Sequence, residues 1–224
     1  MRQLTLTFDN GPWPGPTEAV LDILADRSLR ATFFMVGERL RAPGSRPLAE
    51  RAKAAGHWIG NHTMTHGVPL GLRTEPDAVE QEIGATEALI GPLSHPDRFF
   101  RPHGKGSLGP HLLSRAAADF LIAWRYTVVT WNNVPRDWVE PRAAWPDRAL
   151  AAIAKQPWSV LVLHEHYLDG MMDSLSRFLD RMLAEGVEIV QEFPEDCIPL
   201  RRGEPDETFW SLVLDTPPRP LESA

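Results

Sequence analysis

Two different spacings of apolar residues alternate along the chain. Residues 4–8 alternate leucine or phenylalanine with threonine, which predicts a strand. After a loop rich in proline and glycine, Thr17 begins a segment in which apolar residues recur with the period of a helix. The same succession then repeats: strands are expected over residues 30–36, 57–61, 99–100, 126–131, 159–163 and 187–190, and helices over residues 48–55, 77–90, 110–118, 143–155 and 173–185.

This alternation, about seven strand-helix units in all, predicts an α/β fold with a parallel sheet and right-handed crossovers. The simplest form of such a sheet is a closed barrel, and an open doubly wound sheet is the alternative. From about Arg201 onward the chain contains several prolines and no sustained period. We therefore expect a single barrel domain over residues 1–200, followed by a proline-containing C-terminal tail over residues 201–224.

The composition narrows the range of partners. A net charge of -7 argues against nucleic acid and anionic membranes, because both attract basic surfaces, and it favours a neutral substrate. The single cysteine, Cys197, excludes an intramolecular disulfide. The apolar stretch at the N-terminus is too short and too interrupted for a signal peptide or a membrane span, so we expect a cytoplasmic protein.

Residues with catalytic side chains stand at the ends of the predicted strands. Asp9 follows the first strand directly, before a tight turn at Gly11 and Pro12. Catalytic residues of barrels usually lie at the C-terminal ends of strands, although an ordinary turn aspartate is the plainer alternative. His62 and His66 follow a later strand. Being four residues apart, they would share one face of a helical turn and reach one metal ion, unless they are a surface or core pair.

The later strand ends add another histidine and two charged residues. His164 closes a strand and is a candidate general acid near neutral pH. His166 competes for that role, and spacing alone does not decide between the two. Arg101 also follows a strand and would hold Asp9 ionised. Asp137 lies in a loop from which it would pair with Arg101, and the tryptophan after it would form a wall of the site or stack on a sugar ring.

Five short segments, in this order, resemble the five motifs of the polysaccharide deacetylase family, the NodB-homology domain of carbohydrate esterase family 4. They are T-F-D-N-G-P at residues 7–12, H-T-M-T-H at 62–66, F-R-P-H-G at 100–104, R-D-W at 136–138 and L-H at 163–164. The resemblance covers about residues 3–193. It implies a distorted (β/α)7 barrel, a divalent metal held by two histidines and an aspartate, and hydrolysis of N-acetyl groups on sugars. It also implies that the first aspartate is the base, the last histidine is the acid and the third-motif arginine orients the base.

The sequence departs from the family's pattern in three of the motifs, at four positions. Asn10 stands where a metal-binding aspartate is expected, and because an amide oxygen carries no charge, metal affinity should fall. His103 and Gly104 stand where a proline and an aromatic residue are commoner, so His103 is a candidate extra ligand or subsite residue. Val134 stands where an acidic residue is often found, which bears on the identity of the substrate.

The leading prediction is a metal-dependent hydrolase that removes N-acetyl groups from an amino sugar or oligosaccharide. Zinc is the expected metal, with cobalt, manganese or iron as alternatives, and the expected partner is a small carbohydrate or amide substrate. Two other hypotheses are a hydrolase of cyclic imides or ureides and a degenerate domain that binds a glycan or a protein. The assigned residues are Asp9 as base, His164 as acid, Arg101 and Asp137 holding Asp9 and each other, His62, His66 and Asn10 as metal ligands, and Trp138, His103 and Trp13 as substrate contacts.

Overall fold

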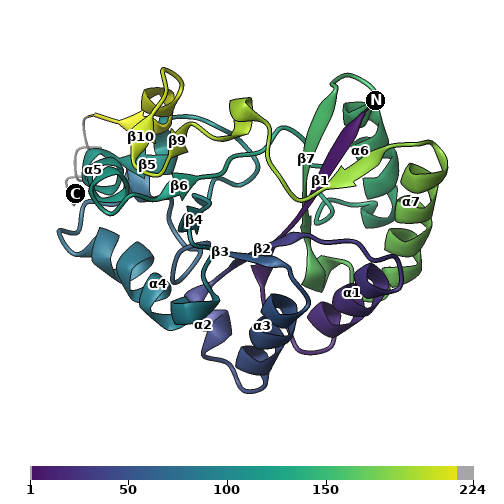
Figure 1. Cartoon of the computed structure of the whole chain (residues 1–224). Coiled ribbons are helices and arrows are strands. Elements are labelled where there is room, and N and C mark those ends of the chain that lie inside the picture. Colours follow the sequence, from purple (N-terminus) through teal and green to yellow (C-terminus); the bar gives the residue numbers. More distant parts are fainter. Residues whose placement is uncertain (1, 216–224) are drawn as a thin grey trace.

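The computed structural model describes residues 2–215 and shows one curled sheet with helices along its outer side (Figure 1). Nine strands make up this sheet, in the order β10-β9-β6-β4-β3-β2-β1-β7, with β8 beside β1. The strands from β6 to β7 in this order run parallel, whereas β9 and β10 extend the far edge in antiparallel orientation. The prediction of an α/β fold with a parallel sheet is confirmed.

Strand β1 (Gln3–Gly11) pairs with three other strands of the sheet. It pairs with β7 (Trp158–His164) from Gln3 to Asp9, and its other edge is shared between β8 (Glu188–Val190) and β2 (Thr32–Met35). The other strands of the sheet are β3 (Trp58–Asn61), β4 (Phe99–Phe100), β6 (Thr127–Val128), β9 (Leu200–Arg201) and β10 (Glu204–Pro205).

A single bridge brings the curled sheet back to β7. The backbone N–H of Asn133 donates to the carbonyl of Val160 (3.2 Å), and the carbonyl of Asn133 accepts from the N–H of Val162 (3.0 Å). This contact closes the curled sheet, so the fold is a barrel and not an open doubly wound sheet. The barrel is distorted because only one residue after β6 pairs with β7.

The helices cover the outer face of the sheet (Figure 1). They are α1 (Pro16–Ala25), α2 (Gly37–Leu40), α3 (Ser45–Ala54), α4 (Ala85–Ile90), α5 (Arg115–Ala123), α6 (Trp145–Ile153) and α7 (Met172–Ala184). Leu6 and Phe8 of β1 are fully buried in one core cluster with Leu24 of α1 and Leu179 of α7. This burial anchors β1 and fixes the position of its C-terminal end. None of the helices between residues 2 and 215 is long and apolar enough to cross a membrane.

The predicted start of the helix over residues 110–118 was wrong. Residues Pro110–Leu112 form only a 3-10 turn, and the α-helix α5 begins at Arg115, after Ser114. The hydroxyl of Ser114 caps the helix by accepting from the N–H of Ala117 (3.2 Å). The chain is extended before this cap because β5 (Leu113–Ser114) pairs with β11 (Val213–Leu214), a partner about 100 residues away that no local pattern reveals.

Part of the expected C-terminal tail packs on the barrel. After β9 and β10, the 3-10 turn Phe209–Leu212 and β11 follow, and Phe209, Leu212 and Val213 are buried in one cluster with Leu121 of α5. Residues 201–215 are thus a packed extension of the sheet edge, and residues 216–224 lie outside the described part of the chain. The domain boundary at residue 200, between the barrel domain and the tail, stays a prediction.

Candidate active site

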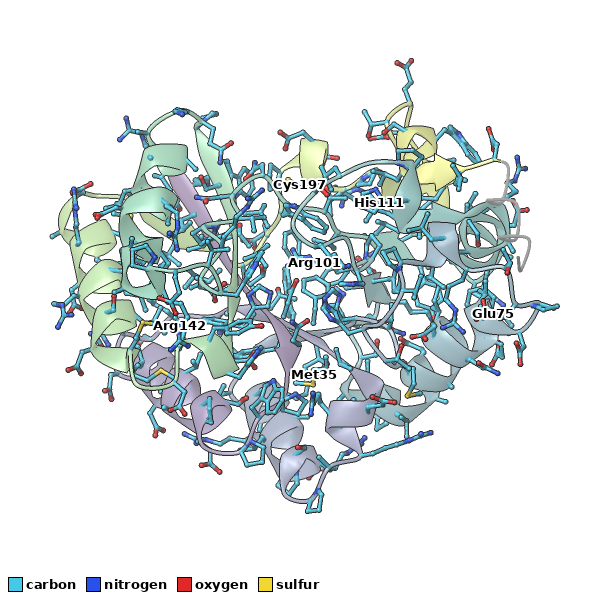
Figure 2. All side chains as sticks on the ribbon, turned by 180° about the vertical axis from the view of Figure 1, so that it is seen from behind. Met35, Glu75, Arg101, His111, Arg142 and Cys197 are labelled. Carbon is cyan, nitrogen blue, oxygen red and sulfur yellow. The ribbon has the colours of Figure 1, made fainter. Side chains whose placement is uncertain are left out.

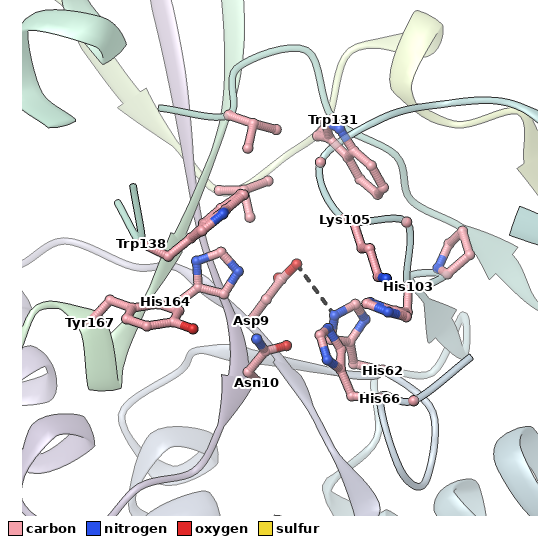
Figure 3. A pocket seen from close by; sticks show the side chains of 16 residues that line it. Asp9, Asn10, His62, His66, His103, Lys105, Trp131, Trp138, His164 and Tyr167 are labelled. Carbon is pink, nitrogen blue, oxygen red and sulfur yellow. Dashed lines mark ion pairs between the residues drawn. The ribbon is translucent and has the colours of Figure 1, made fainter. Parts of the chain in front are cut away.

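A pocket of about 390 Å³ lies at the C-terminal ends of the central strands (Figure 3). Four of its side chains lie at or just after strand ends: Asp9 in β1, His62 after β3, His103 after β4 and His164 in β7. The register of β1 and β7 sets Asp9 directly opposite His164. Parallel strands therefore bring residues far apart in sequence to one mouth of the barrel.

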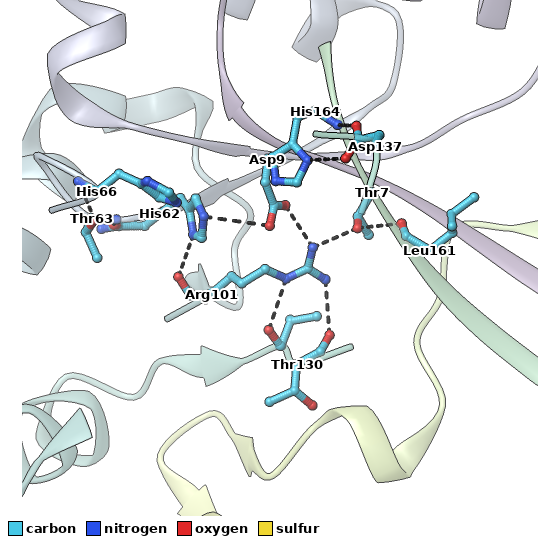
Figure 4. Close-up of polar contacts among 12 residues, drawn as sticks. Thr7, Asp9, His62, Thr63, His66, Arg101, Thr130, Asp137, Leu161 and His164 are labelled. Carbon is cyan, nitrogen blue, oxygen red and sulfur yellow. Dashed lines mark hydrogen bonds and ion pairs between the residues drawn. The ribbon is translucent and has the colours of Figure 1, made fainter. Parts of the chain in front are cut away.

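Arg101 fixes the carboxylate of Asp9 from below the pocket (Figure 4). Its Nη1 donates to Asp9 Oδ1 (2.8 Å) and to Thr7 Oγ1 (2.7 Å). Its Nε and Nη2 donate to the carbonyls of Val129 (3.3 Å) and Thr130 (3.1 Å). The guanidinium is fully buried near the middle of the molecule (Figure 2), where burial lowers the pKa of Arg101 while Asp9 counteracts it. Asp9 is thus oriented through Oδ1, and its Oδ2 faces the histidines.

His62 is held as a neutral imidazole with one free nitrogen. Because the carbonyl of Arg101 can only accept, Nδ1 of His62 carries the proton in their 2.8 Å hydrogen bond. The other nitrogen, Nε2, lies 3.7 Å from Asp9 Oδ2. Burial lowers the pKa of His62 well below its ordinary value. A neutral ring oriented by a carbonyl is the usual form of a metal-binding histidine.

The segment from His62 to His66 is not the helical turn that the spacing predicted. Thr63 and His66 adopt left-handed φ values of 68° and 52°. The side chain of Asn61 causes this turn, because its Oδ1 accepts from the N–H of Thr63 (3.0 Å) and competes with a helical bond. The ring centres of His62 and His66 nevertheless lie 4.9 Å apart. Burial, together with His62 and His103, lowers the pKa of His66 to about 2, so this ring is neutral as well.

Asp137 pairs with His164 and not with Arg101 as the sequence suggested. Asp137 Oδ1 accepts from His164 Nδ1 (2.8 Å), and Oδ2 accepts from the backbone N–H of His164 (2.8 Å). Burial acts to lower the pKa of His164, but the charge and hydrogen bond of Asp137 outweigh it, and the pKa is raised. The guanidinium of Arg101 is already bonded to Asp9, Thr7 and two carbonyls.

Of the two histidines that the sequence offered for the role of acid, His164 lines the pocket and His166 does not. Trp138 lies edge-on to His164, with ring centres 5.1 Å apart, and forms part of the pocket wall. His166 instead packs on Tyr167 and Trp13.

Comparison with known proteins agrees with this geometry. The family model described as polysaccharide deacetylase matches residues 1–110. A chitooligosaccharide deacetylase of Bradyrhizobium sp. (strain ANU 289) is 34% identical over 175 residues, which are 75% of this chain and 73% of that protein. The chain belongs to the polysaccharide deacetylase family. This confirms the resemblance that its five motifs suggested.

Two further relatives come from Bacillus cereus. A peptidoglycan-N-acetylglucosamine deacetylase is 28% identical over 193 residues, which are 84% of this chain and 66% of that protein. The crystal structure of the polysaccharide deacetylase Bc1974 superposes with a TM-score of 0.69 at 25% identity and covers 90% of this chain and 97% of that one. This chain therefore has the fold of a polysaccharide deacetylase, and the predicted distorted barrel is confirmed.

Membership in the polysaccharide deacetylase family implies a divalent metal, and the pocket offers unused donor atoms that fit one. Asn10 Oδ1 and His103 Nε2 are buried without a hydrogen-bond partner, and the ring of His103 packs at a tilt against His66, with ring centres 3.7 Å apart. Burial lowers the pKa of His103 to about 4. Among residues 2–215, no three His, Cys, Asp or Glu side chains form a metal-binding group. The amide of Asn10 lines the pocket together with His62 and His66.

One residue predicted to contact the substrate lies outside the pocket, and several residues that were not predicted line it. Trp13 lies outside the pocket lining, between His166 and the guanidinium of Arg39, which is 3.8 Å from its ring centre. Lys105, Trp131 and Tyr167 line the pocket, although no motif singled them out.

Glu165 was also missed, although its place directly after His164 was a usable signal. It is fully buried, accepts from Thr17 Oγ1 (3.2 Å), and has a pKa that burial raises to about 7. It also explains Gly11, because a Cβ there would lie 2.2 Å from Glu165 Oε1.

Proposed function

We propose that this polysaccharide deacetylase hydrolyses the N-acetyl group of an amino sugar or oligosaccharide, with Asp9 as the base and His164 as the acid. One observation carries the proposal: Asp9, which is held by Arg101, and His164, which is held by Asp137, line one pocket beside two neutral histidines. The relatives named as chitooligosaccharide and peptidoglycan-N-acetylglucosamine deacetylases support the same class of substrate. Trp138 and Trp131 offer aromatic walls on which a sugar ring can stack.

His62, His66 and Asn10 are the proposed ligands of a divalent metal, and zinc is the first candidate, with cobalt, manganese and iron as alternatives. When bound, such a metal acts as a Lewis acid that polarises the amide carbonyl. His103, whose ring packs against that of His66, is proposed as a substrate contact at the edge of the same site.

Asp9 is suited to accept a proton from the attacking water. Its Oδ1 is held by Arg101, so the carboxylate keeps one orientation, and its Oδ2 remains directed at the side of the pocket where His62 lies. The water oxygen bonds to the carbonyl carbon as its proton passes to Asp9. This arrangement is that of general-base catalysis.

His164 is suited to give a proton to the leaving amine. Asp137 binds its Nδ1, which leaves Nε2 to act toward the substrate, and the raised pKa of His164 favours the protonated ring. The carbon–nitrogen bond breaks as this proton arrives, and the products are acetate and a free amine on the sugar.

We expect Asp137→Asn to move the basic limb of the pH profile of kcat/KM to lower pH. The reaction requires the protonated form of His164, so activity falls as pH rises through the pKa of that ring. Asp137 raises this pKa, so removing its charge lowers it. The profile of the free enzyme measures this shift. A basic limb that stays in place would show that His164 is not the acid.

We expect Asn10→Asp to increase metal affinity about tenfold or more, because a carboxylate adds a negative charge where the amide has none. Aspartate tolerates the left-handed φ of 72° at this position about as well as asparagine does. Competition with a chelating indicator measures the affinity, and Asn10→Ala is the matched control that should weaken it. Equal affinity of all three proteins would remove Asn10 from the ligand set.

The substrate class is tested by offering two kinds of carbon–nitrogen bond to the purified protein. N-acetylated chitooligosaccharides should yield acetate and free amine in equal amounts. A cyclic imide and a cyclic ureide, the substrates of the rival hydrolase, should not be opened. Turnover of either ring compound without release of acetate from the oligosaccharides would overturn the proposal.

A further inference from the structure

A buried carboxylate outside the pocket holds the loop that carries His66. Glu82 belongs to a π-helical turn, Glu80–Gly84, that precedes α4, and its side chain is only 3% exposed. Its Oε2 accepts from the backbone N–H groups of Met64 (2.9 Å) and Thr65 (3.0 Å). Its Oε1 accepts from the hydroxyl of Thr65 (2.7 Å). One side chain thus binds two consecutive residues of the segment between the two histidines.

Arg73 supplies a further hydrogen bond to the carboxylate of Glu82. Its Nη1 donates to Glu82 Oε1 at 2.5 Å, and the guanidinium also pairs with the exposed Glu75. Glu82 therefore receives four hydrogen bonds, three from the histidine loop (residues 62–67) and one from a cation. A buried carboxylate with this number of donors is held in one position.

The histidine loop needs such support because its backbone is strained. Thr63 is β-branched and yet has a φ of 68°, and His66 has a φ of 52°. Such conformations persist only where surrounding contacts hold them, and they are common at functional sites. The carbonyls of Thr63 and Met64 are fixed by the N–H groups of Gly37 (3.0 Å) and Glu38 (2.9 Å).

Glu82 supplies the opposing contacts to the N–H groups of Met64 and Thr65, on the other side of this loop. The π-turn also supports a functional role for Glu82, since insertions of this kind in a helix are frequent at functional sites.

We infer that Glu82 is a positioning residue that sets the histidine loop so that His66 faces the pocket in a form able to bind the metal. The inference rests on the metal role of His62 and His66 proposed above. Partners of this kind, which orient ligands without touching the metal, typically change metal affinity 10- to 100-fold.

The test measures cobalt binding by the visible absorption of the bound ion, which reports ligand geometry independently of turnover. Glu82→Gln keeps the shape of the side chain but places an amide NH₂ opposite one of the donors now bound by the carboxylate. We expect its cobalt affinity to be 10- to 100-fold weaker than that of the wild type, with an altered absorption band. Glu80→Gln, an exposed change in the same π-turn, is the matched control and should bind as the wild type does.

A second variant keeps the inference testable if Glu82→Gln does not fold. Thr65→Val removes the hydroxyl that joins the loop to Glu82 Oε1 and that also accepts from the N–H of Gly67 (3.2 Å), and this residue is exposed. We expect several-fold weaker cobalt binding with an unchanged melting temperature. Wild-type affinity and an unchanged band in both variants, or an equal loss in Glu80→Gln, would overturn the inference alone. Absence of cobalt binding by the wild type would overturn the proposed metal role and the inference with it.

Discussion

Asp9→Asn is expected to lower kcat/KM about 10²- to 10⁴-fold while the metal stays bound. Asparagine has the shape of aspartate, and its amide oxygen can still accept from Arg101, so the geometry of Figure 4 is largely kept. The amide cannot take the proton that the attacking water must lose. Acetate release and metal content, measured on the same preparation, separate these two effects.

The control for this variant is its folded stability. Asp9 is the partner of a fully buried guanidinium, and loss of its charge destabilises the protein by about 3–5 kcal/mol in such sites. Activity must therefore be measured at a temperature where circular dichroism shows a native fold. Full activity of a folded, metal-bound Asp9→Asn protein would remove Asp9 from the role of base.

His62→Ala is expected to abolish metal binding and to reduce turnover to background. His62 is the better oriented of the two loop histidines, since its Nδ1 is fixed by the carbonyl of Arg101 and its Nε2 is free. Its loss leaves His66 and the uncharged amide of Asn10, a pair too weak to retain a metal through dialysis. Elemental analysis of dialysed wild type and variant measures this directly.

His95→Ala is the matched control for this change. His95 packs on Trp58 and Phe99 and does not line the pocket, so its variant should retain the metal. Equal metal content in His62→Ala and wild type would place the ion elsewhere. No metal in any of the proteins, even after reconstitution, would favour a metal-free hydrolase or a binding domain.

The pattern of apolar and polar residues in the sequence was sufficient to predict several of the residues that line the candidate site. Short apolar strands separated by helices predict a parallel barrel, and in such a barrel every strand end faces the same mouth. Asp9, His62 and His164 were found in this way, and the structure brings all three to one pocket. Strand register places Asp9 opposite His164, which follows from the pairing of β1 with β7 and not from any local signal.

The partners of these residues were not predictable from spacing. The sequence suggested one network of Arg101, Asp9 and Asp137, whereas the structure has two separate pairs, because Arg101 lies beneath β1 and Asp137 beside β7. The left-handed turn after β3 depends on side-chain contacts from Asn61 and Glu82, which helical spacing does not represent. The late start of α5 likewise depends on a strand more than ninety residues away.

Acetate release from N-acetylated chitooligosaccharides, before and after metal removal, tests the central claim most directly. We expect the chelated protein to release none and to recover full activity when about one equivalent of zinc or cobalt is returned. Undiminished release by the metal-free protein, or no release at any metal content, would contradict the account.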